Sequence, residues 1–493
     1  MPSTSYVGGL NFGQGVSPFL NETVVGSLLL NYLRTVNFIF ISPSFYFLSR
    51  FLLYYLFACR MSSSNSSPKL YHVFSHFYPA TRIGGPIYCS IELIYRLSSI
   101  FSQEVLAFTS CVNRSEWLIR ENFKCNITAD TFFEYIRHTP FSYFKLFHFV
   151  VRASCDLSPS LIVLHGTYNM QYLFSFLLAW CLRVKCIIIP HGTFDINRRK
   201  NSRSWPVRRL SAFYLKLIVG RAFIFFSNEK EIQSAAIVSS DRSRFFTLPV
   251  FVPSCDEDRW QSLLSLLISN RKFLFSDSFQ NSCPNFSDLS KQISSFLISD
   301  QFSQGGSSSS KIIISYFGRI SSEKGLHRIL PDLARLYKAG LISPFVIFGD
   351  GTDPVYVGKI RSICSSLDLP VYITGFLERS LVIKILHYFS PVLVFPSLSD
   401  NFNLCLHEAL AIGLKVFASD RINSIESLNA FSTLNILPYN SFGSSLAAFI
   451  ASGDCAATCS SNDKFNSNLQ SLNLDLLAKY SSAFNSVLTS GSQ

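Results

Sequence analysis

One stretch, residues 391–418, limits most strongly what this chain can fold into. Residues 391–395 form an apolar run that is typical of a buried parallel strand, and Pro396 ends it because proline cannot continue a hydrogen-bonded ladder. Apolar side chains then recur at helical spacing up to Gly413, a common helix stop, before residues 415–418 begin another apolar run. The pattern predicts a strand, a loop, a helix and a second strand, and therefore an α/β fold with a parallel sheet.

Two carboxylates stand in this unit. Asp400 lies in the loop, at the carboxyl edge of the predicted sheet, where open α/β folds bind their ligands. Glu408 lies early in the helix. The backbone amides of residues 401–404 would offer hydrogen-bond donors and the positive end of the helix dipole to an anion at the same place. Each acid alone is better explained as a solvated side chain, so the prediction of a binding site depends on the two together.

The same stretch resembles the signature of retaining group-1 glycosyltransferases (family 4), P-S-x-x-E-x-F-G-x-x-x-x-E-A-x-A-x-G-x-P-V. The two acids keep the spacing of the family, and three positions depart: Asp400 replaces the first Glu, Asn403 the Gly and Lys415 the Pro. Asp keeps the negative charge, and Asn tolerates a positive φ better than most non-glycine residues. The resemblance implies the GT-B fold, in which two Rossmann-like β/α/β domains face each other across a cleft.

A second motif follows the strand predicted at residues 311–317. Its loop begins with Gly318 and Arg319 and continues to Lys324, and it resembles the family's G-R-x-x-x-x-K-G. Two cations at the carboxyl end of a strand suit a diphosphate. The resemblance implies that Arg319 and Lys324 grip the phosphates of the donor and stabilise the leaving group. A P-loop is excluded, because G-x-x-x-x-G-K-[ST] is missing.

Two loops in the first half of the chain carry further family features. A strand predicted at residues 70–74 leads into Gly84 and Gly85, whose lack of a side chain lets backbone amides approach an anion. A plain turn explains this pair as well, and a dinucleotide fingerprint is absent. His191 stands in a P-H-G loop like that of the family, which implies that it approaches the transferred sugar. The alternative is a structural histidine at the end of a strand, with its hydrogen bonds made inside the protein. We interpret His165, after the preceding strand, as structural.

Changes of composition divide the chain into five segments. We expect an N-terminal extension at 1–66, a Rossmann-like acceptor domain at 67–253, a Ser-rich linker at 254–310, a Rossmann-like donor domain at 311–450, and a Ser-rich tail at 451–493 with a helix that crosses back to the first domain. The extension is apolar but interrupted by Pro43 and Arg50. Two interpretations stay open: a membrane-associated segment, or a stretch outside a native protein that starts at Met61.

The balance of charge predicts anionic partners. The net charge is +12, and cations cluster with no acid among them between residues 198 and 221. A nucleotide diphosphate and an anionic membrane surface both fit, whereas nucleic acid has no accompanying motif and is not expected. The 13 cysteines, an odd number without metal-ligand spacing, predict reduced thiols and a cytoplasmic protein, at the inner face of the membrane if the basic cluster docks there.

The resemblance implies a glycosyltransferase that moves a sugar from a nucleotide-diphosphate sugar to a saccharide or lipid-linked acceptor, with retention, in polysaccharide biosynthesis. The nucleotide sugar is a co-substrate, and no cofactor is expected. A metal is not expected either, because the D-x-D at residues 256–258 lies in the linker and not at a strand end. A GT-B nucleotide-sugar epimerase and a catalytically weak GT-B binding protein are the alternatives.

The residues implied in donor binding come from both halves of the chain: Gly84, Gly85, Gly318, Arg319, Lys324, Asp400, Asn401, Phe402, Asn403, Leu404 and Glu408. Catalytic roles fall to His191, Arg319, Lys324 and Asp400. Glu408 would accept hydrogen bonds from ribose hydroxyls, while Asp400 and the amides of residues 401–404 would hold the sugar hydroxyls. No side chain is assigned as a nucleophile.

Overall fold

The computed structural model describes residues 68–77, 85–109, 117–119, 123–128, 131–137, 142–156, 158–167, 169–192, 216–236, 242–251, 273–275, 285–299, 311–351, 353–428, 431–453 and 462–490. All of these lie in one compact unit, Ser64–Gln493. The predictions for residues 1–66, for Gly84, for the cations between 198 and 209 and for the acids at 256–258 fall outside the described residues.

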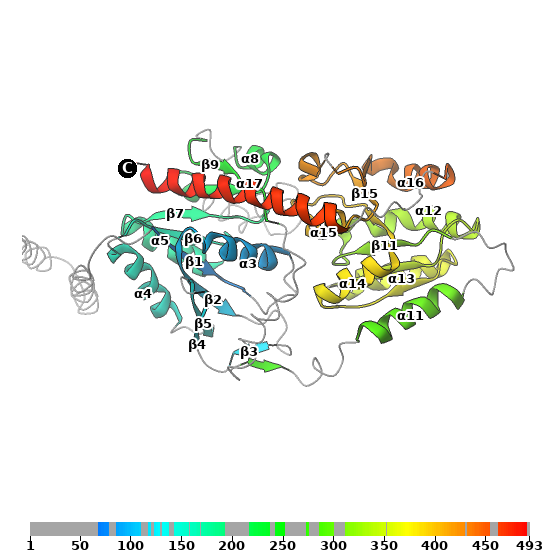
Figure 1. Ribbon diagram of the computed structural model, residues 1–493, viewed down its shortest axis with the longest axis horizontal. Coiled ribbons are helices and arrows are strands. Elements are labelled where there is room, and N and C mark those ends of the chain that lie inside the picture. Colours follow the sequence, from blue (N-terminus) through cyan, green and yellow to red (C-terminus); the bar gives the residue numbers. More distant parts are fainter. Residues whose placement is uncertain are drawn as a thin grey trace, which may run out of the picture. The chain divides into compact units, whose positions relative to one another are not determined.

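The first half of the unit holds an eight-stranded sheet in the order β4-β5-β2-β1-β6-β7-β8-β9 (Figure 1). Neighbouring strands are parallel except at the edge, where β4 runs antiparallel to β5. The strands are β1 (Lys69–Phe74), β2 (Ser102–Thr109), β4 (Phe123–Thr128), β5 (Thr131–Arg137), β6 (Ser160–Leu164), β7 (Lys185–Ile188), β8 (Phe223–Phe226) and β9 (Phe245–Thr247).

The second half holds a six-stranded sheet in the order β13-β12-β11-β14-β15-β16, and all of its neighbouring strands are parallel. The strands are β11 (Ile314–Phe317), β12 (Phe345–Phe348), β13 (Val371–Ile373), β14 (Val392–Phe395), β15 (Val416–Ser419) and β16 (Leu434–Leu437). Two parallel-sheet α/β halves confirm the predicted fold class.

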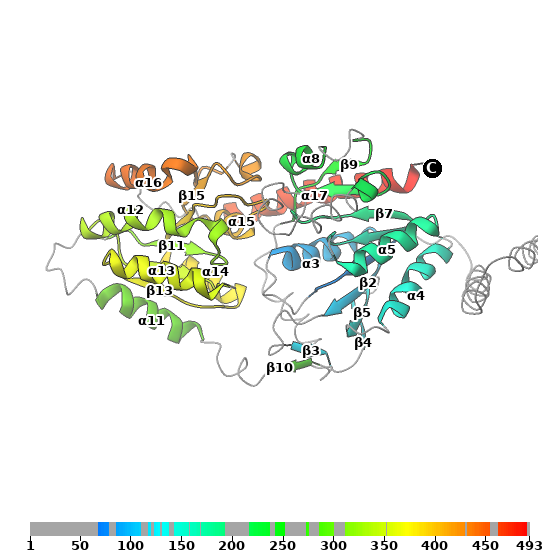
Figure 2. The ribbon, with the colours of Figure 1, turned by 180° about the vertical axis from the view of Figure 1, so that it is seen from behind.

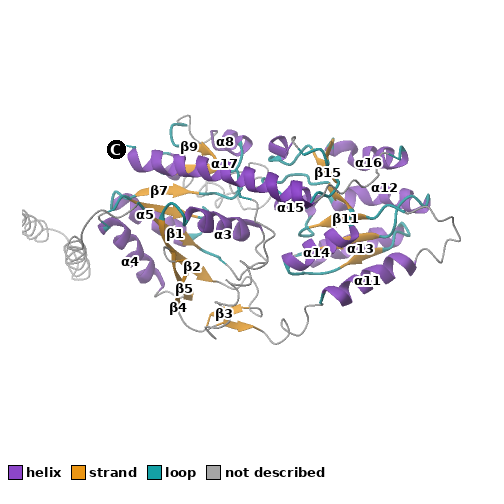
Figure 3. Cartoon of the chain, in the orientation of Figure 1, coloured by secondary structure: helices purple, strands orange, loops and turns teal. Residues whose placement is uncertain are grey.

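Helices follow the strands in both halves (Figure 3). In the first half they are α3 (Gly85–Leu97), α4 (Ser142–Cys155), α5 (Met170–Cys181) and α8 (Glu229–Ala236). In the second half they are α12 (Leu326–Lys338), α13 (Pro354–Ser366), α14 (Arg379–Phe389), α15 (Leu404–Ala411) and α16 (Phe442–Ala451).

The order of strands reverses once in each sheet. In the first sheet β1 lies between β2 and β6, and in the second sheet β11 lies between β12 and β14. Ligands of open α/β sheets bind outside the carboxyl ends of the strands at such a reversal, because the two flanking loops run in opposite directions and leave a crevice. The loops after β1, β6, β11 and β14 flank these reversals. Those after β1, β11 and β14 carry the Gly-Gly pair, the G-R-x-x-x-x-K-G motif and Asp400, in that order.

The segment at 254–310, marked by its composition as a linker, contributes to both halves. Strand β10 (Phe273–Phe275) pairs antiparallel with β3 (Trp117–Ile119). Helix α11 (Phe286–Ser299) buries Leu289 and Ile293 in the core of the second half. The second core therefore begins with α11 rather than at residue 311, because the apolar face of this helix packs there in spite of its many polar neighbours.

The last helix, α17 (Asn462–Thr489), packs on the first sheet, beside α3 (Figures 1 and 2). Along β6, alternate residues face opposite sides: Leu161 joins the core that contains α3 and α17, and Ile162 joins the core under α4 and α5. The Lys185 ammonium donates to the carbonyls of Val487 (3.0 Å) and Leu488 (2.7 Å) at the end of α17. A lysine in this position satisfies carbonyls that have no partner within the helix.

No helix within the described ranges combines the length and the apolar character that a membrane crossing requires.

The packing of α17 makes a first prediction. Phe484 is fully buried against Phe101 and Phe225, with ring centroids 5.7 and 5.1 Å away. Phe484→Ala should lower the free energy of unfolding by about 3–5 kcal/mol through lost contacts and a cavity. Leu474→Ala, in the same helix but 62% exposed, should change it by less than about 0.5 kcal/mol. Urea unfolding measures both, and equal losses would mean that α17 does not dock through this face.

Candidate functional site

The loops after β11 and β14 are packed directly against each other. Gly325 has φ +70°, and a side-chain carbon there would overlap the carbonyl oxygen of Pro396. The amide of Leu398 donates to the carbonyl of Glu323 at 2.8 Å, which ties the two loops together. Only glycine fits at position 325, because the backbone conformation is left-handed and the space is filled.

This packing brings two of the predicted residues into contact. Lys324, at the end of its loop, forms an ion pair with Asp400 from the loop after β14. Both side chains are mostly buried, at 15% and 14% exposed. The predicted phosphate-binding cation and sugar-binding carboxylate therefore meet at the reversal of strand order in the second sheet.

Arg319 lies in the same loop and is more exposed, at 40%. Its guanidinium donates to the carboxylate of Glu323 at 3.0 Å, and its carbonyl accepts from the Tyr316 hydroxyl at 2.9 Å. Gly318 has φ +138°, which suits glycine at this turn. Glu323 was not singled out by the sequence, and it offsets part of the charge that Arg319 would present to a phosphate.

Helix α15 begins as predicted, but Asn403 acts differently from the expectation. Its φ is −78°, so its tolerance of positive φ is not used here. Instead the Asn403 side chain accepts from the amide of Leu406 at 3.2 Å as the cap of the helix. An asparagine favours this position because it supplies one of the missing partners at a helix start. Phe402, its neighbour, stacks on His407 with ring centroids 3.9 Å apart.

Glu408 is 2% exposed and forms an ion pair with Arg379, the first residue of α14. Burial raises the pKa of the Glu408 carboxyl, and the Arg379 guanidinium opposes this shift. Arg379 was not predicted from the sequence. A cation in the first turn of a helix is disfavoured by the helix dipole, and that unusual placement is a signal that could have drawn attention to it.

Asn401 contacts residues of the first half of the chain. Its side-chain oxygen accepts from Asn228 at 2.8 Å, and its side-chain nitrogen donates to Ser227 at 2.7 Å. A Cβ at Gly192 would lie 2.8 Å from the Asn401 Cβ, and one at Gly85 would lie 3.2 Å from the Leu404 Cβ. The 401–404 segment thus touches the P-H-G loop, the start of α3 and the loop after β8.

His191 has φ +49°, which is rare for a residue with a side chain. Burial lowers the pKa of its imidazole to about 4, so the ring is neutral at physiological pH. The structure therefore places His191, Gly85 and the 401–404 segment near one another, and Lys324 with Asp400. Arg319 and Glu408 each have a different partner, Glu323 and Arg379.

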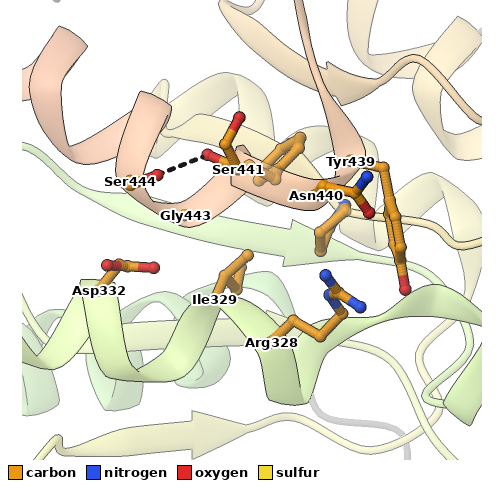
Figure 4. Close-up of a pocket in the computed structure, with 10 residues that line it drawn as sticks. Arg328, Ile329, Asp332, Tyr439, Asn440, Ser441, Gly443 and Ser444 are labelled. Carbon is orange, nitrogen blue, oxygen red and sulfur yellow. Dashed lines mark hydrogen bonds between the residues drawn. The ribbon is translucent and has the colours of Figure 1, made fainter.

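A separate pocket lies between α12 and the start of α16 (Figure 4). Its lining includes Arg328, Asp332, Tyr439 and Gly443. The guanidinium of Arg328 lies 4.1 Å from the centre of the Tyr439 ring. None of the residues predicted to bind the donor lines this pocket, which meets their loops only at Pro396.

No group of three or more His, Cys, Asp or Glu side chains within the described ranges is arranged to hold a metal ion.

Residues 298–433 match the family model described as Glycosyl transferases group 1. This segment contains both motifs of the second half. No curated protein matches the chain.

Solved structures of the GT-B fold resemble the chain at low sequence identity. HepE from Anabaena, in complex with UDP, is 14% identical with a TM-score of 0.56, covering 85% of this chain and 100% of that one. Sucrose-phosphate synthase from Thermosynechococcus elongatus is 14% identical with a TM-score of 0.56, covering 86% and 100%. A UDP-forming α,α-trehalose-phosphate synthase from Burkholderia vietnamiensis is 13% identical with a TM-score of 0.57, covering 87% and 98%. At this identity the likeness shows the fold, which is GT-B, and with the family match it supports a group-1 glycosyltransferase.

Loop packing at Gly325 can be tested against a matched glycine. Gly325 and Gly340 have nearly the same φ, +70° and +73°, but a Cβ at Gly340 would meet nothing within 4 Å. Gly340→Ala should cost about 1–2 kcal/mol of stability, the strain of a left-handed alanine. Gly325→Ala carries the same strain and also pushes the Pro396 backbone away. Urea unfolding should therefore show a clearly larger loss of stability for Gly325→Ala than for Gly340→Ala. Equal losses would show that the two loops are not in contact.

The Arg379–Glu408 pair predicts a dependence of stability on pH. Because the pKa of folded Glu408 lies above its unfolded value, the folded state binds more protons between the two values, and stability falls as pH rises through that window. Arg379→Met removes the opposing charge, which widens the window and should cost about 3–5 kcal/mol at neutral pH. The loss should shrink on acidification toward the ordinary carboxyl range.

Glu408→Gln in the Arg379→Met background is the control for that experiment, because it removes the buried charge. Urea unfolding at several pH values should show the double variant more stable than Arg379→Met at neutral pH and less dependent on pH. A pH dependence that survives in the double variant would assign the effect to another group.

Proposed function

We propose that this protein is a group-1 glycosyltransferase that transfers a sugar from a nucleotide-diphosphate sugar to a saccharide or lipid-linked acceptor. One observation carries the proposal. A lysine and a carboxylate, Lys324 and Asp400, meet at the carboxyl edge of the second sheet, where its strand order reverses. This is the place where a doubly wound sheet binds a nucleotide, and the family match spans it.

The proposed chemistry follows from the charges around that point. The diphosphate is the leaving group, and its negative charge grows in the transition state. Lys324 and Arg319, on one loop, would stabilise this charge, and each already has an acidic partner that a phosphate would replace: Asp400 and Glu323. Once Lys324 turns to the phosphates, Asp400 can accept hydrogen bonds from hydroxyls of the transferred sugar. Glu408, oriented by Arg379, would accept from the ribose.

The finer features of the proposal rest on the sequence motifs. We propose transfer with retention of the anomeric configuration, as in family 4, because the acid pair keeps the spacing of that signature. We propose that no metal or other cofactor is needed, because two side-chain cations supply the positive charge. A role in polysaccharide biosynthesis is favoured by the Gly84-Gly85-Pro86 loop, which resembles that of polysaccharide-synthesis members of the family. Peripheral contact to an anionic membrane is favoured by the basic cluster between residues 198 and 221.

The first experiment is a thermal-shift screen of nucleoside diphosphates and their sugars. UDP and UDP-glucose come first, because solved structures of HepE carry these ligands. A ligand that binds only the folded state raises the melting temperature by mass action. We expect at least one nucleotide sugar to do so, and the same compound to serve as the donor in a transfer assay over a panel of acceptors.

Lys324→Ala and Arg319→Ala test the proposed leaving-group site. Each should reduce turnover about 100- to 1,000-fold, as expected when one donor to a developing negative charge is lost. Lys338→Ala is the matched control, since Lys338 pairs with Asp368 at 3.2 Å on an exposed surface of the same half. Steady-state kinetics of donor hydrolysis and transfer decide the matter. Unchanged turnover in both site variants would refute the assignment.

A further inference from the structure

A row of buried polar side chains leads from the interior of the first sheet to His191. His72, on β1, is fully buried and lies 3.0 Å from His165, measured from Nδ1 to Nε2. His165 Nδ1 lies 3.3 Å from the hydroxyl of Ser90 on α3. The same hydroxyl lies 3.5 Å from His191 Nε2. The rings of His165 and His191 are nearly parallel, with centroids 5.8 Å apart.

All three imidazoles are neutral, so each has one donor nitrogen and one acceptor nitrogen. Burial lowers the pKa of His72 to about 3 and that of His191 to about 4. Burial and the two neighbouring histidines lower the pKa of His165 well below its ordinary value. Neutral rings in a row must alternate donor and acceptor, so the proton position on one ring decides that on the next.

The inner end of the row fixes the direction of the hydrogen bonds. The amide nitrogen of Gln103 donates to the carbonyl of Ile94 at 2.7 Å, which leaves the amide oxygen of Gln103 for His72. Burial is the main reason that the pKa of His72 is low, and the nearby Gln103 side chain opposes this shift. Gln103 Oε1 and His72 Nε2 are both buried, and neither makes a hydrogen bond in the structure. The complementary arrangement has the His72 proton on Nε2, where it supplies the donor that the Gln103 oxygen lacks, and leaves Nδ1 to accept.

With the His72 proton on Nε2, the donor and acceptor of each following hydrogen bond are set. His165 donates from Nε2 to His72 and accepts at Nδ1 from the Ser90 hydroxyl. The Ser90 hydroxyl uses its hydrogen to donate to His165, so its oxygen accepts a hydrogen bond from His191 Nε2. The remaining nitrogen of His191, Nδ1, is left with a lone pair.

We propose that Ser90 and His165 are positioning residues that hold His191 in the Nε2–H form, with Nδ1 available to accept a hydrogen bond from a hydroxyl of the transferred sugar. This rests on the proposed function for the identity of the ligand, but the proton positions do not. It also gives His165 a role beyond the structural one that the sequence indicated. Tyr172 fixes the backbone of His165, because its hydroxyl donates to the His165 carbonyl at 2.5 Å.

Nitrogen-15 NMR of histidine-labelled protein tests the proton positions directly, because protonated and unprotonated ring nitrogens have well-separated shifts. The chain has nine histidines, and His191 is assigned by the signals lost in His191→Gln. We expect His191 to be protonated on Nε2, with that proton protected from exchange with water. Ser90→Ala should remove the protection, whereas Ser90→Thr, which keeps a hydroxyl, should retain it.

Ser175→Ala is the matched control, because Ser175 is also fully buried in a helix and donates only to a backbone carbonyl, that of Gln171 at 2.8 Å. It should leave the His191 signals unchanged. His191 protonated on Nδ1 in the parent protein, or equal protection in the parent and Ser90→Ala, would overturn the inference whatever the enzyme activity.

A second readout separates this inference from the proposed function. Ser90→Ala should lower kcat/KM for the nucleotide sugar about tenfold. It should not change the affinity for the free nucleoside diphosphate, because only the sugar would contact His191. Equal loss for both ligands would mean that Ser90 supports the site as a whole, which contradicts the assignment. If no nucleotide sugar binds at all, the proposed function fails, and the NMR result alone decides the proton positions.

Discussion

The contact between Gly325 and the Pro396 backbone is the constraint on which the candidate site depends. It holds the loops after β11 and β14 against each other, so that Lys324 and Asp400 can pair across the gap between two strand ends. A buried ion pair of this kind is weak evidence for stability, because desolvation cancels much of the attraction. Its placement at the reversal of strand order, where open α/β sheets bind their ligands, is what the proposed donor site requires.

The electrostatics of the site follow the same pattern at three positions. Arg319, Lys324 and Arg379 each face a carboxylate, so the positive charge that an anionic ligand would meet is balanced within the protein. The balance differs between the pairs. The Arg319 and Glu323 side chains are 40% and 39% exposed, so solvent weakens their attraction and a phosphate could replace Glu323 at small cost. Glu408 is almost fully buried, and its pair with Arg379 is suited to orienting a side chain.

Much of the fold could be predicted because its signals are local. The apolar runs at β11 and β14, the helical spacing of α15 and the glycine after it are properties of neighbouring residues, and the structure has each of them. Partners far apart in sequence could not be found this way. Arg379 meets Glu408 from 29 positions away, and Asn228 meets Asn401 across 173 positions. The packing of α11 was missed because its buried leucines are spaced among serines typical of a linker.

Amide hydrogen exchange with a bound nucleotide sugar tests the central claim most directly, because it reports every segment of the backbone that the ligand orders. The compound that stabilises the protein most in the thermal-shift screen should slow exchange in residues 318–325 and 401–404 of the second half, and at His191 and Gly192 of the first. Slower exchange confined to the pocket beside Tyr439, or no change in either loop of the second half, would contradict a donor site at the reversal of strand order.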